Sequence, residues 1–179
     1  MLCHSRSRAV PGEGDPKTEA VFVGQGPGEN EDASGRPFVG RAGDLLNIFL
    51  EAAGILRKEV WITNVTRCLP PDGRLPLAVE IKACIPYLLE EIDIIKPVVV
   101  CPLGNMALHC FMGKSEKIKD VRGKPFPQRS YFLFPMLHPA AVLRRLDLHS
   151  HAQADFLNLR KFLDSKPKLI PPPGQESLF

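Results

Sequence analysis

Short and almost uninterrupted apolar runs alternate with helical patterns along this chain, and this alternation restricts the possible folds more than any other feature. The runs are AVFVG (Ala20–Gly24), VWITN (Val60–Asn64), VVVC (Val98–Cys101) and YFLF (Tyr131–Phe134). The first three lack the polar alternation that is expected of a strand with one solvated face. We therefore expect strands that are buried on both faces, as in a parallel sheet between layers of helices.

Apolar residues at helical spacing fill the segments between these runs. The patterns are AGDLLNIFLEAAG, which ends at Gly54, AVEIKACIPYLLEEIDIIK, which stops before Pro97, the short GNMALHCFMG, and a last one over 152–163. Glycine and proline are common stop signals for helices. The order predicts an α/β fold, a three-layer α/β/α sandwich with a central, mostly parallel four-stranded sheet. Residues 1–165 would form this domain, followed by an extended Pro-rich tail at 166–179.

The composition is that of an ordinary globular domain. Of 179 residues, 44% are hydrophobic and 24% are charged, which is enough for one sizeable core. No apolar run is long enough to span a bilayer, and the start, MLCHSRSR, lacks the apolar segment of a secretory signal. We therefore expect a cytoplasmic protein with no membrane partner.

The charge of the chain is unevenly distributed. The net charge is only +3, but the segment 114–168 holds twelve Lys and Arg against five Asp and Glu. A basic C-terminal third is typical of a protein that binds a polyanion, although a solvated charged face explains it equally well.

Polar residues follow three of the predicted strands. Gln25 comes after the first run, Asn64 closes the second, and His138 follows the fourth. Ligands of parallel sheets bind beyond the carboxyl ends of the strands, so we expect these side chains around one crevice. An Asn amide suits the edge of an amide-like base such as uracil, and a His can donate to an oxygen that gains negative charge. A turn-capping Asn and a structural His are the alternatives.

The loop VGQGPGENED after the first run is not a phosphate-binding motif. It lacks the G-K-[ST] of a Walker A sequence, Pro27 removes one backbone donor, and the next helical pattern begins only near Ala42. One wall of a base pocket is the better interpretation, with Gly26 and Gly28 allowing close approach of the backbone. In GRPFVGRAG, Phe38 either stacks on a base or belongs to the core.

The five cysteines contain no C-x-x-C pair. Cys68 and Cys84 are separated by fifteen residues, and Cys3 is the only other cysteine outside the predicted core elements. Zinc and iron–sulfur sites normally need four ligands, so two thiolates are half a site. Cys101 and Cys110 are expected to be small buried residues.

Eight ordered sequence blocks, over about Arg6 to Arg144, resemble the family 4 uracil-DNA glycosylases, the iron–sulfur type. The blocks are RAVPGEGDP, FVGQGPGENED, GRPFVGRAG, LEAAGI, VWITNVTRCLPP, EIKAC, VRGKPF and FPMLHPA. The resemblance implies a uracil-DNA glycosylase-like fold and hydrolysis of the N-glycosidic bond of uracil in single- or double-stranded DNA. This is the base excision repair step that releases uracil and leaves an abasic site, and the enzyme must either flip the base out of a duplex or accept single strands.

The same resemblance implies a role for each residue of the crevice. Gln25, Gly26 and Gly28 would belong to the loop that holds the base and the attacking water. Phe38 would stack on uracil, Asn64 would bind its Watson–Crick edge, and His138 would stabilise the leaving uracil anion.

The chain departs from the family pattern at three places, which are Gln25, Gly73 and the N-terminal C-x-x-C. The family usually reads G-E-[AG]-P-G, and a neutral Gln25 amide cannot act as a general base. We expect any carboxylate assistance to come from Glu31, with Asp32 behind it. In PPDGRLP, Gly73 stands where the family commonly has an Asn. There are two alternatives. The enzyme could act on another deaminated base, such as hypoxanthine or xanthine, or the protein could be a non-catalytic module that binds uracil-DNA or the clamp.

The family's [4Fe-4S] cluster is held by an N-terminal C-x-x-C and two later cysteines, which match Cys68 and Cys84. The place of the C-x-x-C falls just before Met1. We expect a start that is set too late or a truncation, with loss of the cluster or partial substitution by Cys3 as the alternatives.

Basic residues near His138 and the C-terminal peptide are expected to contact larger partners. Arg122, Arg144 and Arg145 would contact DNA, and Leu143 would act as an apolar wedge. An ordinary short amphipathic helix is the alternative for the segment PAAVLRR. The ending GQESLF, through Gln175, Ser177, Leu178 and Phe179, resembles the peptide that docks on the bacterial sliding clamp. We expect a monofunctional enzyme, since no lysine is placed to form a Schiff base. We also expect a monomer.

Overall fold

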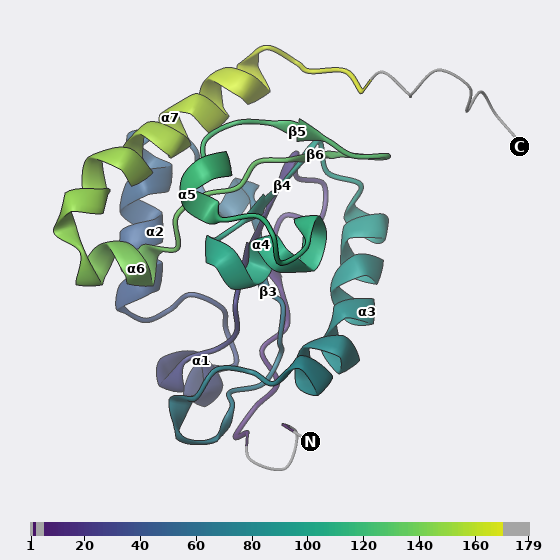
Figure 1. Ribbon diagram of the computed structural model, residues 1–179, viewed down its shortest axis with the longest axis vertical. Coiled ribbons are helices and arrows are strands. Elements are labelled where there is room, and N and C mark those ends of the chain that lie inside the picture. Colours follow the sequence, from purple (N-terminus) through teal and green to yellow (C-terminus); the bar gives the residue numbers. More distant parts are fainter. Residues whose placement is uncertain (1, 3–5, 170–179) are drawn as a thin grey trace, which may run out of the picture.

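A computed structural model describes residue 2 and residues 6–169 (Figure 1). A six-stranded sheet forms its centre, in the order β1-β3-β2-β4-β6-β5. The strands are β1 (Glu13–Gly14), β2 (Ala20–Gly24), β3 (Trp61–Asn64), β4 (Val99–Pro102), β5 (Phe126–Pro127) and β6 (Phe132–Leu133). Cys3 and the proposed clamp peptide lie outside the described residues.

The four predicted strands are confirmed and pair in parallel, as β3-β2-β4-β6. The expected strand count was too low, because β1 and β5 add antiparallel edges to the sheet. Each of these edge strands has only two residues, Glu-Gly and Phe-Pro, which is too short to produce an alternating pattern. The sheet is therefore mixed, while the α/β/α class is as expected.

The helices cover both faces of the sheet. They are α1 (Glu29–Ser34), α2 (Arg41–Ala52), α3 (Ala78–Ile95), α4 (Gly104–Met112), α5 (Ile118–Val121), α6 (Pro139–Arg144) and α7 (His149–Asp164). Figure 1 shows α2 and α7 on one side and α3 on the other. The helices α2, α3, α4 and α7 were predicted. The short α1 and α5 were not, α6 was weighed only as the alternative interpretation of PAAVLRR, and α1 corrects the expectation that no helical segment precedes Ala42.

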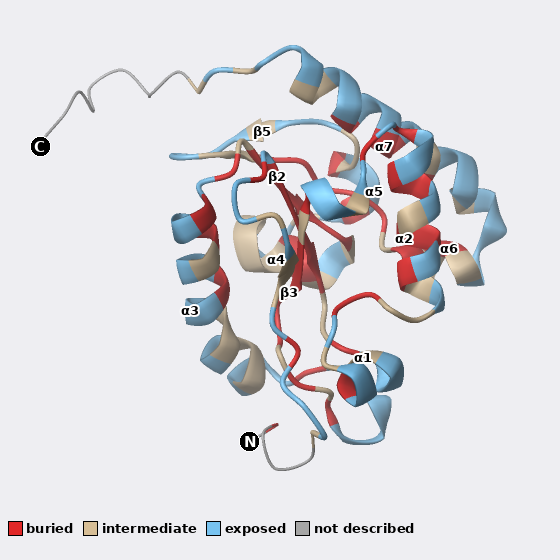
Figure 2. Ribbon diagram, turned by 180° about the vertical axis from the view of Figure 1, so that it is seen from behind, coloured by how far each residue is buried: buried red, intermediate tan, exposed pale blue. Residues whose placement is uncertain are grey.

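Strand β2 shows why the runs are almost continuously apolar. Phe22 points into a core with α2 and α7, where its ring stacks on Phe156 at a centroid distance of 5.9 Å. Val21 and Val23 point the opposite way, into a second core with Leu88 of α3. Both faces of the strand are thus covered, and Figure 2 shows the buried residues concentrated on the central strands.

The carboxyl ends of the parallel strands lie at one edge of the sheet. Strand β2 leads into the loop at Gln25, β3 ends on Asn64, and a bridge between Leu103 and Met136 extends β4 and the chain after β6 towards His138. No helix among the described residues is long and apolar enough to cross a membrane.

Candidate active site

A pocket of about 630 Å³ opens at the carboxyl ends of the strands. It is lined by the residues that the sequence predicted for the crevice, namely Gln25, Gly26, Gly28, Glu31, Phe38, Asn64 and His138, with Arg144 at its side. The pocket also reaches the start of α4, at Gly104 and Asn105, which the sequence did not indicate. Its volume is that of a small-molecule site and exceeds the size of a single base.

Gly24 lies where two of the side chains meet. A methyl group at this position would collide with Asn64 Oδ1 and with the ring of Phe38. Strand β2 therefore ends on a residue without a side chain because β3 and the Phe38 loop both occupy that space.

Phe38 is buried but its backbone is in the left-handed region, with φ of +52°. This conformation costs a non-glycine residue about 1–2 kcal/mol. The backbone carbonyl of Phe38 lies against Gly43 of α2, where any side chain would collide with it. The Phe38 ring faces the ring of His138 at 5.8 Å, with an angle of 30° between the planes. Strain of this kind is typical of functional sites that the surroundings hold in place.

Asn64 places a buried acceptor without a protein partner at the end of β3. The residue is 2% exposed, and its Oδ1 has no hydrogen-bond partner among the described residues. A buried acceptor without a partner costs about 1–3 kcal/mol, so such groups normally have one. A ligand with an N–H group at the base of the pocket would supply that donor.

His138 is held as a neutral donor. It is the N-cap of α6, and its Nδ1 accepts a hydrogen bond from the backbone N–H of Ala140 at 3.1 Å. An accepting Nδ1 has no proton, so the neutral ring carries its proton on Nε2. Burial, together with the positive charge of Arg144, lowers the pKa of His138 to about 4. At neutral pH the ring can donate from Nε2 but is not a cation.

Gln25 stands on a loop that is fastened to β3. The backbone carbonyl of Gln25 accepts from the N–H of Thr66 at 3.1 Å, and that of Gly24 accepts from Val65 at 2.9 Å. None of the described hydrogen bonds uses the Gln25 side-chain amide, which is half-buried in the pocket wall.

Glu31 links the two loops that frame the pocket. Its Oε1 accepts from the N–H groups of Val39 and Gly40 at 2.8 and 2.9 Å, and its Oε2 accepts from Gly28 at 3.1 Å. Asp32 is likewise bound, to the backbone N–H of Ser7 at 2.9 Å. Both carboxylates are therefore used to shape the backbone, which is the geometry of a brace.

The residues expected to contact DNA fall into two groups. Arg144 and Arg145 are exposed beside the pocket, although Arg145 pairs with Asp147 at 2.6 Å. Arg122 instead pairs with buried Asp155 at 2.8 Å, and it thereby ties the end of α5 to α7. Burial raises the pKa of Asp155 to about 6, although Arg122 opposes that rise.

The apolar residue that projects from this surface is not the one that we expected. Leu143 is half-buried and packs against the core, whereas Leu146, three residues later, is 78% exposed. The segment RRLDL did hold a signal for it, since Leu146 is an isolated apolar residue between an arginine pair and an aspartate.

The cysteines do not form a complete metal site in the described part of the chain. Cys68 is buried and its Sγ accepts from Arg6 Nη1 at 3.0 Å, while Cys84 is half-buried on α3. No group of three or more His, Cys, Asp or Glu residues there is placed to hold a metal. An iron–sulfur cluster therefore does not fit the described residues alone. Burial raises the pKa of the Cys101 thiol, as expected of an inert core residue.

The fold and the sequence together place the chain in a known superfamily. Residues 11–163 match the family model of the Uracil DNA glycosylase superfamily, and the chain belongs to that superfamily. A crystal structure of wild-type SMUG2 from Pedobacter heparinus has the same fold, with a TM-score of 0.56 and 11% identity, over 83% of this chain and 77% of that one.

Within the superfamily, the chain belongs to the type-4 uracil-DNA glycosylases. It is 47% identical to the type-4 enzyme of Thermotoga maritima, over 78% of this chain and 74% of the relative. It is 44% identical to that of Sulfurisphaera tokodaii, over 89% and 77%. It is also 44% identical to that of Pyrobaculum aerophilum, over 89% and 88%.

Proposed function

We propose that this protein is a monofunctional uracil-DNA glycosylase, which hydrolyses the N-glycosidic bond of uracil in DNA and leaves an abasic site. The observation that carries the proposal is the buried, unpaired Oδ1 of Asn64 in a pocket that also contains His138, whose neutral ring holds a proton on Nε2. Uracil offers what both need, an N–H at N3 and a carbonyl oxygen at O2. The type-4 relatives support the same activity.

Asn64 would read the base. Its Oδ1 accepts from N3–H of uracil, and its Nδ2 donates to O4. Cytosine has no proton on N3 and an amino group at C4, so both contacts become repulsive in this orientation of the amide. The Phe38 ring would stack on one face of the flipped base, which adds affinity for any planar base but little discrimination.

His138 would stabilise the leaving group. As the glycosidic bond breaks, negative charge develops on the uracil ring, and Nε2–H donates to O2. One such preorganised donor contributes roughly 10²–10³ in rate. Because the leaving anion is stabilised in this way, no covalent nucleophile is needed.

The attacking water would be oriented by the loop at Gln25 without a free carboxylate base. Glu31 is the one carboxylate among the described residues that line the pocket, and both of its oxygens are bound to backbone N–H groups. The Gln25 amide can accept from a water or donate to it but cannot remove its proton. Rate therefore depends mainly on His138.

DNA would be held beside the pocket by the face that carries Arg144 and Arg145. We propose Leu146 as the apolar wedge that fills the gap in the duplex after the base leaves, because its exposure exceeds that of Leu143. Arg122 would act structurally, through Asp155.

Two further parts of the proposal concern ligands and partners. Cys68 and Cys84 would serve as two ligands of a [4Fe-4S] cluster, and iron and sulfide analysis of the purified protein tests this.

The C-terminal peptide would dock on a sliding clamp, through Gln175, Ser177, Leu178 and Phe179. Removing residues 175–179 should abolish clamp binding and spare excision; unchanged clamp affinity would refute the docking. We further propose a monomer that acts in the prokaryotic cytoplasm.

The activity is tested with a uracil-containing oligonucleotide, followed by alkali to cleave abasic sites. We expect strand scission only after alkali, since the proposed enzyme has no lyase step. Scission of hypoxanthine or xanthine oligonucleotides but not of the uracil substrate would establish the second candidate, which the neutral Gln25 favours. Binding without scission of any substrate in a single turnover would establish a non-catalytic module.

A further inference from the structure

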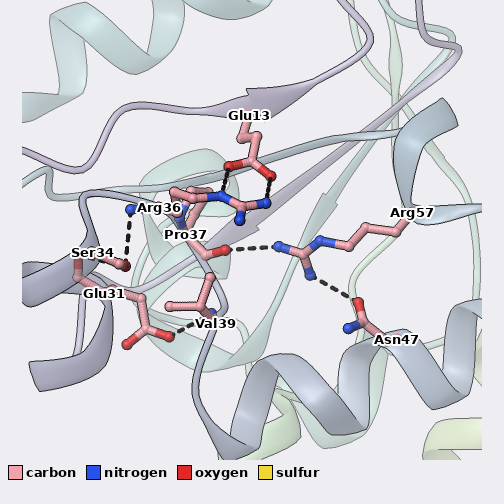
Figure 3. Close-up of polar contacts among 8 residues, drawn as sticks. All are labelled: Glu13, Glu31, Ser34, Arg36, Pro37, Val39, Asn47 and Arg57. Carbon is pink, nitrogen blue, oxygen red and sulfur yellow. Dashed lines mark hydrogen bonds and ion pairs between the residues drawn. The ribbon is translucent and has the colours of Figure 1, made fainter.

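Phe38 lies between Pro37 and Val39, and other side chains hold the backbone of both neighbours (Figure 3). After it, the backbone N–H groups of Val39 and Gly40 bind Glu31. Before it, the backbone carbonyl of Pro37 accepts a hydrogen bond from Arg57 Nη2 at 2.8 Å. The strained residue is thus enclosed by a carboxylate on one side and a guanidinium on the other.

Arg57 reaches this carbonyl from outside the pocket. It stands on the short 3-10 turn η2 (Arg57–Glu59) and does not line the pocket itself. Its Nη1 donates to Asn47 Oδ1 of α2 at 2.8 Å, so the guanidinium bridges the loop and the helix. Figure 3 shows both bonds leaving the same guanidinium. The side chain is half-buried, and both acceptors are uncharged.

The direction of the Pro37 carbonyl and that of the Phe38 ring are geometrically coupled. The carbonyl lies in the peptide plane that precedes Phe38, and rotation about φ of Phe38 turns this plane relative to the side chain. A carbonyl that is fixed in space therefore fixes φ. Relaxation of Phe38 to a negative φ would turn the carbonyl away from Arg57 and the ring away from His138.

A second arginine on the same loop provides a contrast. Arg36 pairs with Glu13 at 2.7 Å, but their side chains are 62% and 35% exposed. An exposed ion pair of this kind adds little to the order of a loop. Arg36 also binds no atom of the peptide planes that flank Phe38.

We propose that Arg57 is a positioning residue for base stacking, which holds Phe38 in its left-handed conformation through the Pro37 carbonyl and aims the ring at the base. The inference rests on the stacking role that is proposed for Phe38. It assigns to excision a residue that contacts neither the base nor the pocket.

The test compares Arg57→Met, which removes the donors, with Arg57→Lys, which keeps the charge and one donor, and with Arg36→Met as the matched control. We expect Arg57→Met to lower the single-turnover rate on uracil DNA by about tenfold or more, because small displacements of positioning groups have effects of this size. Inhibition by free uracil should weaken in parallel. Affinity for abasic-site DNA should stay the same, since phosphate contacts dominate it. Arg57→Lys should fall between, and Arg36→Met should change the rate less than about twofold.

A double-mutant cycle with Phe38→Leu separates positioning from general stabilisation. If Arg57 acts through Phe38, adding Arg57→Met to Phe38→Leu should cause almost no further loss. Equal losses in both backgrounds would overturn the inference. A full rate for Phe38→Leu alone would instead overturn the stacking role itself. Thermal midpoints identify any variant that fails to fold, and Arg57→Lys then replaces Arg57→Met in the cycle.

Discussion

His138 accepts a hydrogen bond at Nδ1 from the backbone N–H of Ala140, at 3.1 Å, and this bond leaves Nε2 as the donor of the neutral ring. Replacing His138 by Ala should therefore lower single-turnover excision by roughly 10²–10³. Affinity for abasic-site DNA should remain, because the phosphate contacts are elsewhere. An equal loss of DNA affinity would contradict the proposed role.

The depressed pKa of His138 should make the free energy of unfolding depend on pH. Its pKa in the folded protein is about 4, below the ordinary value of 6.5. A depressed value means that the unfolded chain binds the proton more readily between these two values, so stability is present above pH 6.5 and falls as the pH drops towards 4. The loss is at most about 3 kcal/mol. Urea unfolding of the wild type and His138→Asn should diverge in that window; parallel curves would contradict it.

Asn64→Ala should reduce excision of uracil by at least about 100-fold while salt-dependent DNA binding stays nearly intact. The loss follows from removing both contacts to the base edge. Gel-shift and single-turnover measurements on the same oligonucleotide check this. Equal reduction of binding and rate would argue against base reading by Asn64.

Gln25→Glu should add the missing general base. We expect a higher single-turnover rate, by about tenfold or more, and a new acid limb in the pH–rate profile where the introduced carboxylate titrates. Glu31→Gln is the matched control, since it removes charge from the brace and should only lower the rate. A Gln25→Glu variant with the wild-type profile would show that no base is limiting.

Leu146→Ala should impair excision from double-stranded DNA and leave single-stranded DNA almost unaffected, because only the duplex leaves a gap to fill. Leu143→Ala is the control. That side chain packs against the core, so its removal should lower the thermal midpoint and affect both substrates alike. The reverse pattern would restore Leu143 as the wedge.

The parallel strands could be predicted because burial on both faces leaves a continuous apolar run in the sequence. The longer helices could be predicted because burial of one face leaves apolar residues at helical spacing. The convergence of Gln25, Asn64 and His138 followed from strand direction alone. The two-residue edge strands and the short helices carry too few residues for any period. The edge strands also depend on long-range pairing, such as that of Glu13 with Ile62.

The roles of Glu31 and Arg57 depend on contacts that no local pattern reveals. Glu31 was expected to assist the reaction because it is acidic and close to Gln25, but its backbone partners at Val39 and Gly40 lie eight and nine residues away. Arg57 contacts a carbonyl twenty residues earlier. Only the folded chain brings either group to the Phe38 loop.

The bonds from Glu31 to both loops have a kinetic consequence. Since Glu31 joins the two loops within the protein itself, the proposed base pocket would already be formed before DNA arrives. Capture would then depend on whether the extrahelical nucleotide binds in the pocket before it returns to the stack. Uracil in weakly paired or frayed DNA would be captured most often, because it leaves the stack more frequently. The excision rate would therefore depend on the local stability of the duplex as well as on the identity of the base.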